Sequence, residues 1–219
     1  MNKKEKNAGL AAGLSILIMA IAAGFSYGYV HTLLVVESTQ ATARNLIENQ
    51  SLFLYELIGW VLIFISDLIV AYALLVYFRS TRYSISLLTA ATRVVYTLFL
   101  GIAIYQLFSL VPIINGTGSA DEIISKLNAF ENIWSAGLIL FGFHLAGLGY
   151  LSIKSQFVPG WLGYLLYLGS ISYVVVHSAK QLNYFEQAFL ITLENALALP
   201  MALGELAIAF WFIYKGLKK

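Results

Sequence analysis

Long apolar segments separated by short polar ones dominate the 219-residue chain. Each has about 20 residues or more, enough for a helix that crosses a hydrocarbon layer of about 30 Å. An open sheet would leave backbone groups unpaired in lipid, and the segments lack the two-residue alternation of a β-barrel. The pattern predicts an all-α, polytopic membrane bundle with six spanning helices, at about residues 9–34, 52–78, 84–111, 133–153, 160–178 and 195–215.

Composition supports this prediction, because 60% of the residues are hydrophobic and only 11% are charged. Soluble domains have about 45–50% apolar and about 25% charged residues. The composition therefore excludes a water-soluble enzyme, a nucleic-acid-binding domain and a disordered chain. Since there is no cysteine, thiol nucleophiles and thiolate metal sites are excluded as well. Six spans leave few residues for a soluble domain, so we expect a single transmembrane domain over residues 1–219.

The basic residues predict the topology. With the N-terminus inside, nine lysines and arginines fall on cytoplasmic segments and three, Arg44, Lys126 and Lys180, fall on external ones. This asymmetry follows the positive-inside rule. We therefore predict that both termini are cytoplasmic, which requires an even number of spans.

The connections between the segments differ on the two sides. The cytoplasmic turns at 79–83 and 154–160 are short, so the helices they join should be adjacent and antiparallel. The external connections are longer, and we expect short amphipathic helices there, on the outer surface. The clearest candidate begins with the capping-box pattern of Ser119 to Glu122 and places Ile123, Leu127 and Phe130 on one face. Residues 38–50 and 180–193 are further candidates.

Several glycines in the later spans have spacings that permit close helix packing. Small residues let two membrane helices approach each other closely. We interpret these glycines as packing positions: Gly137, Gly142, Gly147, Gly149, Gly163 and Gly169.

Four ionisable residues lie inside the predicted spans, on helices two, three, four and six: Asp67, Arg93, His144 and Glu205. Each is 10 to 12 residues from a basic residue at the cytoplasmic end, or about 15–18 Å at the rise of an α-helix. A charge at the bilayer centre costs about 2.5–3.5 kcal/mol, so these groups should face inward and meet one another or water. Nearby Tyr96 and Tyr150 could extend this polar layer.

The expected pairing follows from the helix connections. Arg93 keeps its proton and needs a carboxylate partner. Asp67 is the first choice, because the two residues are 26 apart on helices joined by a tight turn. Glu205 and His144 then form a second pair that could share one proton. Arg93 would either be neutralised by Asp67 or hold an anionic group.

Three functions remain open for the polar layer. It could bind or conduct a small ligand or a proton in a transporter, receptor or sensor. It could belong to an intramembrane enzyme acting on a lipid, with His144, Asp67 and Glu205 holding a metal, or with Glu205 and His144 as acid and base. It could also be a structural ion-pair network.

The expected ligands and partners are limited. Arg93 would repel a divalent ion, so no metal is predicted. Retinal is disfavoured because no lysine lies in mid-span, and haem because His144 has no histidine partner at its depth. The expected partners are the lipid bilayer and a small-molecule or lipid ligand, not nucleic acid. The sequence identifies no cofactor and sets no oligomeric state.

The second half of the chain carries a recognisable pattern, formed by Phe141-Gly142-Phe143-His144-Leu145, Gly149-Tyr150-Leu151 and Lys154-Ser155-Gln156-Phe157-Val158-Pro159. Together with Asp67, Arg93 and Gly204-Glu205, it resembles the bacterial membrane family called domain of unknown function 4386. Gly160-Trp161, in a cytoplasmic turn, departs from the family pattern. The resemblance implies a six-helix, multi-pass protein of the bacterial inner membrane and implies no activity.

Overall fold

The computed structural model describes residues 2–116, 118–182 and 184–218, and over these residues it is helical with no strand. The first span begins with α1 (Lys3–Ala23), widens into a π-helix, η1 (Gly24–His31), and ends in α2 (Thr32–Leu34). The other elements are α3 (Thr39–Glu48), α4 (Gln50–Phe78), α5 (Tyr83–Phe108), α6 (Leu110–Ile114), α7 (Ala120–Lys154), α8 (Gly160–Gln181) and α9 (Gln187–Leu217).

Six helices are long and apolar enough to cross a membrane, as predicted: Lys3–Leu34, Gln50–Phe78, Tyr83–Ile114, Ala120–Lys154, Gly160–Gln181 and Gln187–Leu217. Their ends extend beyond the predicted apolar segments because polar residues cap them. At the N-terminus, Asn2 Oδ1 accepts from the Glu5 backbone N–H at 2.9 Å, and Glu5 Oε2 accepts from the Asn2 N–H at 2.8 Å. This reciprocal cap starts α1 at Lys3, ahead of the apolar run.

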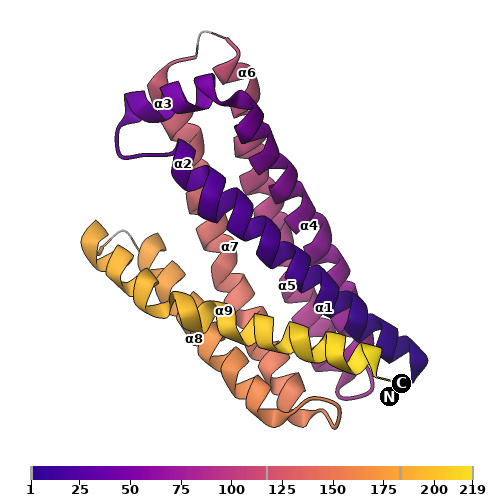
Figure 1. Ribbon diagram of the computed structural model, residues 1–219. Coiled ribbons are helices and arrows are strands. Elements are labelled where there is room, and N and C mark those ends of the chain that lie inside the picture. The colour runs from indigo at the N-terminus through magenta and orange to yellow at the C-terminus, as the bar shows by residue number, and fades with distance from the viewer. Residues whose placement is uncertain (1, 117, 183, 219) are drawn as a thin grey trace.

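The spanning helices form a closed ring in the order α1, α4, α5, α7, α8, α9, in which each packs on the next and α9 returns to α1 (Figure 1). Both termini lie at the same end of the bundle, where Lys6 Nζ donates to the Lys218 carbonyl at 2.5 Å. An even number of spans requires this arrangement. The side of the membrane on which this end lies remains a prediction from the basic residues.

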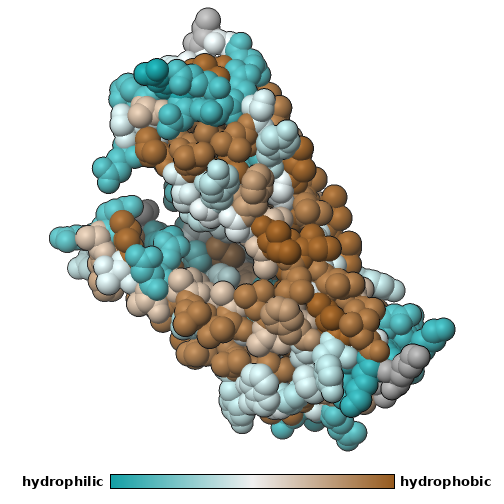
Figure 2. Space-filling model, in the orientation of Figure 1, coloured by the Kyte–Doolittle hydropathy of each residue, from teal (hydrophilic) through white to brown (hydrophobic). Residues whose placement is uncertain are grey.

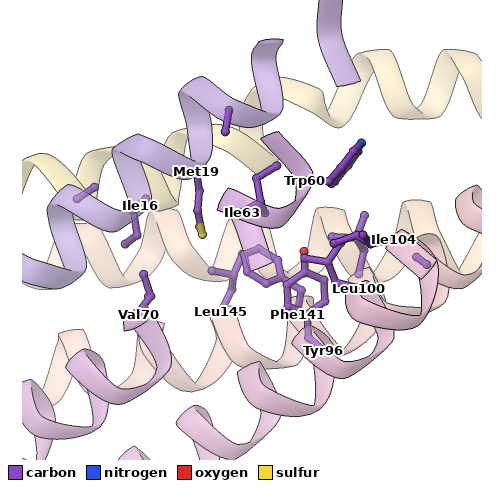
Figure 3. Packing of buried hydrophobic residues seen from close by; sticks show 14 of the residues in the cluster. Ile16, Met19, Trp60, Ile63, Val70, Tyr96, Leu100, Ile104, Phe141 and Leu145 are labelled. Carbon is purple, nitrogen blue, oxygen red and sulfur yellow. The ribbon is translucent and has the colours of Figure 1, made fainter. Parts of the chain in front are cut away.

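The ring encloses a packed apolar interior. Side chains from facing helices meet there, including Met19, Trp60, Tyr96, Phe141 and Leu145 (Figure 3). The outward faces are also apolar, and polar residues gather at the two ends (Figure 2). Ile21 is 74% exposed and Leu88 is 64% exposed, and such side chains are stable only when lipid covers them.

Glycines let α7 and α8 approach backbone to backbone, as the sequence predicts. A Cβ added to Gly163 would lie 2.6 Å from the Gly149 carbonyl oxygen, and one added to Gly149 would lie 2.9 Å from that of Gly163. Because each glycine lacks a side chain, the backbone of the other helix can occupy the place that a Cβ would take.

The amphipathic segment after Ser119 is not a separate surface helix. It is the first part of α7, which runs without interruption from Ala120 to Lys154. Ser119 Oγ accepts from the Glu122 N–H at 3.2 Å, as a helix cap should. No glycine or proline interrupts residues 120–136, so the helix continues. Its apolar face packs on α3 and the neighbouring core instead of on a membrane surface.

The other two expected surface helices have different outcomes. α3 is indeed a short helix between the first two spans, and it buries Thr42, Ala43 and Leu46. The described part of 180–193 contains no separate helix, because α8 continues to Gln181 and α9 begins at Gln187. These residues extend the two spanning helices and form an arm that diverges from α1 and α3 (Figure 1).

The topology can be tested with single cysteines, since the chain has none. Gln40, on α3, and Ser80, in the turn between α4 and α5, are both exposed and lie at opposite ends of the bundle. In intact cells, a membrane-impermeant maleimide should label the Gln40→Cys variant and not Ser80→Cys, which should react only after lysis. Labelling of Ser80→Cys in intact cells would reverse the predicted orientation.

The close α7–α8 contact predicts a difference between two glycines in the same turn of α8. Gly163→Ala should lower the free energy of unfolding by about 1–3 kcal/mol because it overpacks the contact. Gly160→Ala should be tolerated, since a Cβ there meets nothing within 4 Å. Denaturant unfolding in mixed micelles measures both, and equal losses would contradict the packing role.

Candidate functional site

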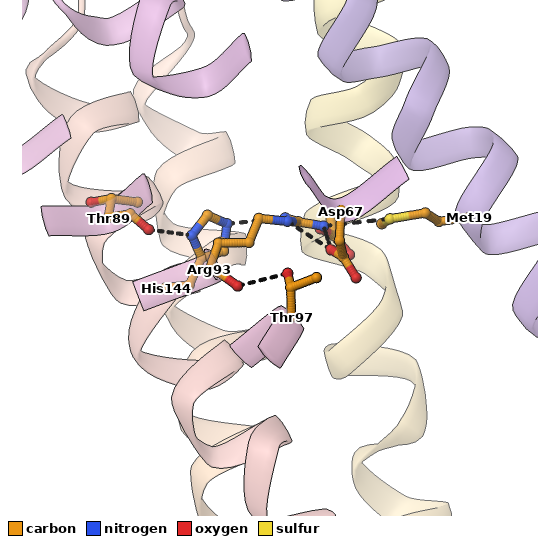
Figure 4. Close-up of polar contacts among 7 residues, drawn as sticks. Met19, Asp67, Thr89, Arg93, Thr97 and His144 are labelled. Carbon is orange, nitrogen blue, oxygen red and sulfur yellow. Dashed lines mark hydrogen bonds and ion pairs between the residues drawn. The ribbon is translucent and has the colours of Figure 1, made fainter. Parts of the chain in front are cut away.

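The four predicted ionisable residues meet around one guanidinium group at the centre of the ring. Arg93, on α5, is fully buried, and its side chain extends between α4 and α7 (Figure 4). Its partners come from four other spanning helices: α1, α4, α7 and α9. A single side chain therefore links five of the six spans.

The predicted pairing of Asp67 with Arg93 is confirmed. Arg93 Nε donates to Asp67 Oδ1 at 2.8 Å, and Nη2 lies 2.6 Å from the same oxygen. Asp67 is 1% exposed, so water does not weaken the pair. The tight turn between α4 and α5 places the two residues at matching depth, as the sequence indicates.

The remaining donors of Arg93 are also engaged. Nη1 donates to Glu205 Oε1 at 2.9 Å and to His144 Nε2 at 3.1 Å. Nη2 donates to the sulfur of Met19 at 3.6 Å. Of the five N–H groups of a guanidinium, four donate hydrogen bonds here, and Nη2 also forms an ion pair with Asp67. Of the two roles considered for Arg93, the structure shows neutralisation by carboxylates.

His144 is neutral and fixed in one tautomer by its two contacts. Its Nδ1 lies 2.9 Å from the Thr89 carbonyl, which can only accept, so Nδ1 carries the hydrogen. Its Nε2 faces an arginine N–H, which can only donate, so Nε2 presents its lone pair. The expected pair of Glu205 and His144 is wrong: Arg93 Nη1 contacts both residues, and His144 holds the guanidinium rather than a shared proton.

The cluster contains one more carboxylate than cation. Asp67 and Glu205 each carry a carboxylate, Arg93 is the one positive group, and His144 is neutral. Both short contacts of Asp67 use Oδ1, and its buried Oδ2 has no hydrogen-bond partner in the structure. Among the described residues, Glu205 makes its hydrogen bond through Oε1 alone. Two carboxylate oxygens are therefore available to accept a proton or a donor.

These carboxylates line a cavity of about 330 Å³ to which all six spanning helices contribute. Apart from Asp67 and Glu205, its walls are mainly apolar and aromatic: Ile16, Met19, Ala20, Ala23, Trp60, Ile63, Tyr96, Trp134, Leu138, Phe141, Tyr173, Met201, Ala202 and Leu206. This volume lies in the range of small-molecule sites.

A second, more polar cavity of about 360 Å³ adjoins the first, nearer the end opposite the termini. The two share Trp134, Leu138, Tyr173 and Met201. Charged residues at the outer end include Glu131, and Lys180 Nζ lies 2.8 Å from Glu194 Oε2. Figure 2 shows the hollow between the α8–α9 arm and the rest of the molecule.

Access to the carboxylates is one-sided. Toward the termini, Ile16, Val70, Leu145 and Ile208 are at most 1% exposed and pack inside the ring. The carboxylates are therefore closed off from the terminal end of the bundle.

The two predicted tyrosines differ in position. Tyr96 lines the cavity and packs on Phe141, with ring centroids 5.0 Å apart. Tyr150 is half-buried and outside the cavity lining. Six residues separate it from His144 on α7, which places it about 9 Å further along the helix and on another face.

Sequence reasoning missed a second buried polar cluster nearer α3. His31 Nδ1 lies 2.7 Å from Glu56 Oε1, which also accepts from Trp60 Nε1 at 3.3 Å. His31 Nε2 lies 3.5 Å from Glu131 Oε1. The π-helical turn of η1, which ends at His31, is the local feature that accompanies this contact. A spacing of 25 residues between His31 and Glu56 carries no motif that could have predicted it.

The cluster predicts unequal effects for its two carboxylates. Asp67→Asn should lower the free energy of unfolding by about 3–5 kcal/mol, because it leaves the buried Arg93 without its closest partner. Glu205→Gln should cost no more than about 1.5 kcal/mol, since the amide oxygen still accepts from Arg93 and Asp67 still balances its charge.

Denaturant unfolding in mixed micelles measures these losses, with Glu186→Gln at an exposed position as the control. A double-mutant cycle that adds Arg93→Met should show losses well below additivity. Additive losses would contradict the Asp67–Arg93 pair.

Comparisons with known proteins place the chain among proteins without an assigned activity. A family model, "Domain of unknown function (DUF4386)", matches residues 11–216. An uncharacterised protein of Archaeoglobus fulgidus is 32% identical over 165 residues, which are 75% of this chain and 86% of that protein. No solved structure matches the chain. The match extends over nearly all the described helices, and the protein belongs to the DUF4386 family of integral membrane proteins.

Proposed function

We propose that this membrane protein takes up a positive charge, as a proton or a small cation, at Asp67 and Glu205 from the side where α3 lies. The observation that carries the proposal is the buried Oδ2 of Asp67, which has no hydrogen-bond partner and belongs to a residue that lines the central cavity. A buried polar atom without a partner is costly, so it favours an occupant that can donate to it.

Charge balance supports the same conclusion. A net negative charge in a low-dielectric interior is unfavourable, and one added positive charge makes the cluster neutral. A proton on either carboxylate would do this, and so would a bound cation. Arg93 keeps its proton and already pairs with both carboxylates, and His144 is neutral. The two carboxylates are therefore the groups that can take up a proton or bind a cation.

One-sided access supports a carrier or sensor that opens to the outside. The positive-inside rule puts the termini in the cytoplasm, so the cavity would open to the external face of the bacterial inner membrane. Ionisable residues inside membrane spans typically mark substrate or proton pathways. An intramembrane site closed on one side is what an alternating-access carrier has in one of its states.

The structure favours this function over a metal-dependent lipid enzyme. Among the described residues, no three histidine, aspartate or glutamate side chains converge closely enough to hold a metal ion. Both ring nitrogens of His144 are hydrogen-bonded, one to Arg93 and one to Thr89, so His144 is also unsuited to act as a general base. A purely structural network would account for Arg93, and it would not account for the open cavity beside Asp67 and Glu205.

Proton uptake at these carboxylates can be measured by infrared difference spectroscopy of the reconstituted protein, between mildly alkaline and mildly acidic pH. Wild-type protein should gain the carbonyl stretch of a protonated, buried carboxylic acid. The band should be lost or strongly shifted in Glu205→Gln, because neutralising one carboxylate balances the charge of Arg93. Glu186→Gln, at an exposed site, should keep the band. A spectrum of Glu205→Gln identical to that of wild type would refute the proposal.

A further inference from the structure

We infer that the ligand of the central cavity is a protonated amine with an apolar, preferably aromatic, body, which reaches the site between α1 and α9. This inference rests on the proposed function and narrows it from any positive charge to one chemical class of ligand. It requires a charged head that pairs with carboxylates, a body that suits the walls, and an opening that admits both.

The head group follows from the atoms that lack partners. Asp67 Oδ2 is buried and unpartnered, and Glu205 uses only Oε1. Both carboxylates bind the same guanidinium and both residues line the same cavity, so a cationic group bound there would face both. An ammonium with N–H groups can donate to such oxygens, whereas a quaternary ammonium cannot. An anionic head is excluded because it would face two carboxylates.

The body of the ligand follows from the walls. Five of the lining residues, Trp60, Tyr96, Trp134, Phe141 and Tyr173, are aromatic, and most of the others are aliphatic. Aromatic faces attract a cation and also stack on an aromatic group. A bare metal cation would gain little from such walls, whereas an amine with an apolar body would contact them over most of its surface.

The opening follows from how α9 packs. Between Gln187 and Pro200 no residue of α9 is buried, and the first buried residue is Met201. Beyond it, α9 packs tightly on α1, where a Cβ on Gly13 would lie 2.6 Å from the Ala209 carbonyl. The two helices therefore close at the terminal end and diverge toward the other.

Small residues lie where α1 and α9 begin to separate. Ala20 on α1 and Ala202 on α9 are both exposed and both line the cavity. Further toward the diverging end of α9, apolar side chains including Phe189 and Leu199 are exposed. In the predicted topology this opening faces the outer half of the membrane, from which an amine with an apolar body would enter.

The test measures binding of 3-phenylpropylammonium to the full-length protein in nanodiscs. Trp60 and Trp134 line the cavity, so their fluorescence reports on binding. Three analogues separate the requirements: 3-phenylpropanol lacks the charge, its N,N,N-trimethyl ammonium counterpart lacks N–H donors, and methylammonium lacks the body. The amine should bind at least tenfold more tightly than each. Equal binding of the amine and the alcohol would overturn the inference without any variant being made.

Variants then locate the site. Glu205→Gln should weaken amine binding at least tenfold, and Glu186→Gln should leave it unchanged. Amine binding that is unaffected by Glu205→Gln would overturn the inference. An infrared carboxyl band that depends on Glu205, without amine binding, would overturn the ligand class and leave the proposed function intact, and absence of both would overturn both.

A last variant tests the route. Ala202→Trp narrows the opening between α1 and α9 and keeps both carboxylates, so it should slow association at least tenfold in stopped-flow fluorescence. Gln187→Trp, which narrows the polar outer cavity instead, should have a smaller effect. The reverse order would show that the amine enters through the polar cavity and would overturn the proposed route.

Discussion

One buried guanidinium links five of the six spanning helices through hydrogen bonds and ion pairs. Arg93 is 0% exposed and donates to residues of α1, α4, α7 and α9 from its own place on α5. A charge in mid-membrane is tolerated only when it is neutralised and all its donors are used, so the positions of these helices are coupled. The ring can shift at this depth only if several of these contacts change together.

The same constraint creates the chemistry of the site. Holding Arg93 in place uses one oxygen of Asp67 and one of Glu205, and a neutral His144 completes the set. One guanidinium neutralises only one of the two carboxylates. The remaining negative charge belongs to residues that line the cavity. The polar layer can therefore have a structural and a functional role at once. Arg93 and His144 hold the helices in position, and the free carboxylate oxygens can bind a proton or a cation.

Pairing across a short turn was predictable, and pairing across the ring was not. Asp67 and Arg93 lie on helices joined by a tight connection, so matching depth was enough to predict their contact. Glu205 and His144 lie on α9 and α7, which α8 separates in the ring, and depth alone could not show that Arg93 would stand between them. The contacts of His31 with Glu56 and Glu131 likewise depend on the π-helical turn and on the packing of α7, which no local spacing specifies.

The sequence by itself determined the six spans, the even count that puts both ends on one side, and the four ionisable residues at one depth. Hydrophobic length and the cost of buried charge are local properties, so they can be predicted from composition along the chain. Only the tertiary structure decided that residues 120–130 continue α7, that Arg93 contacts residues of four other spans, and that a cavity opens beside two carboxylates. Those features depend on the order of helices around the ring and on the divergence of α9 from α1, which arise from contacts between residues far apart in the chain.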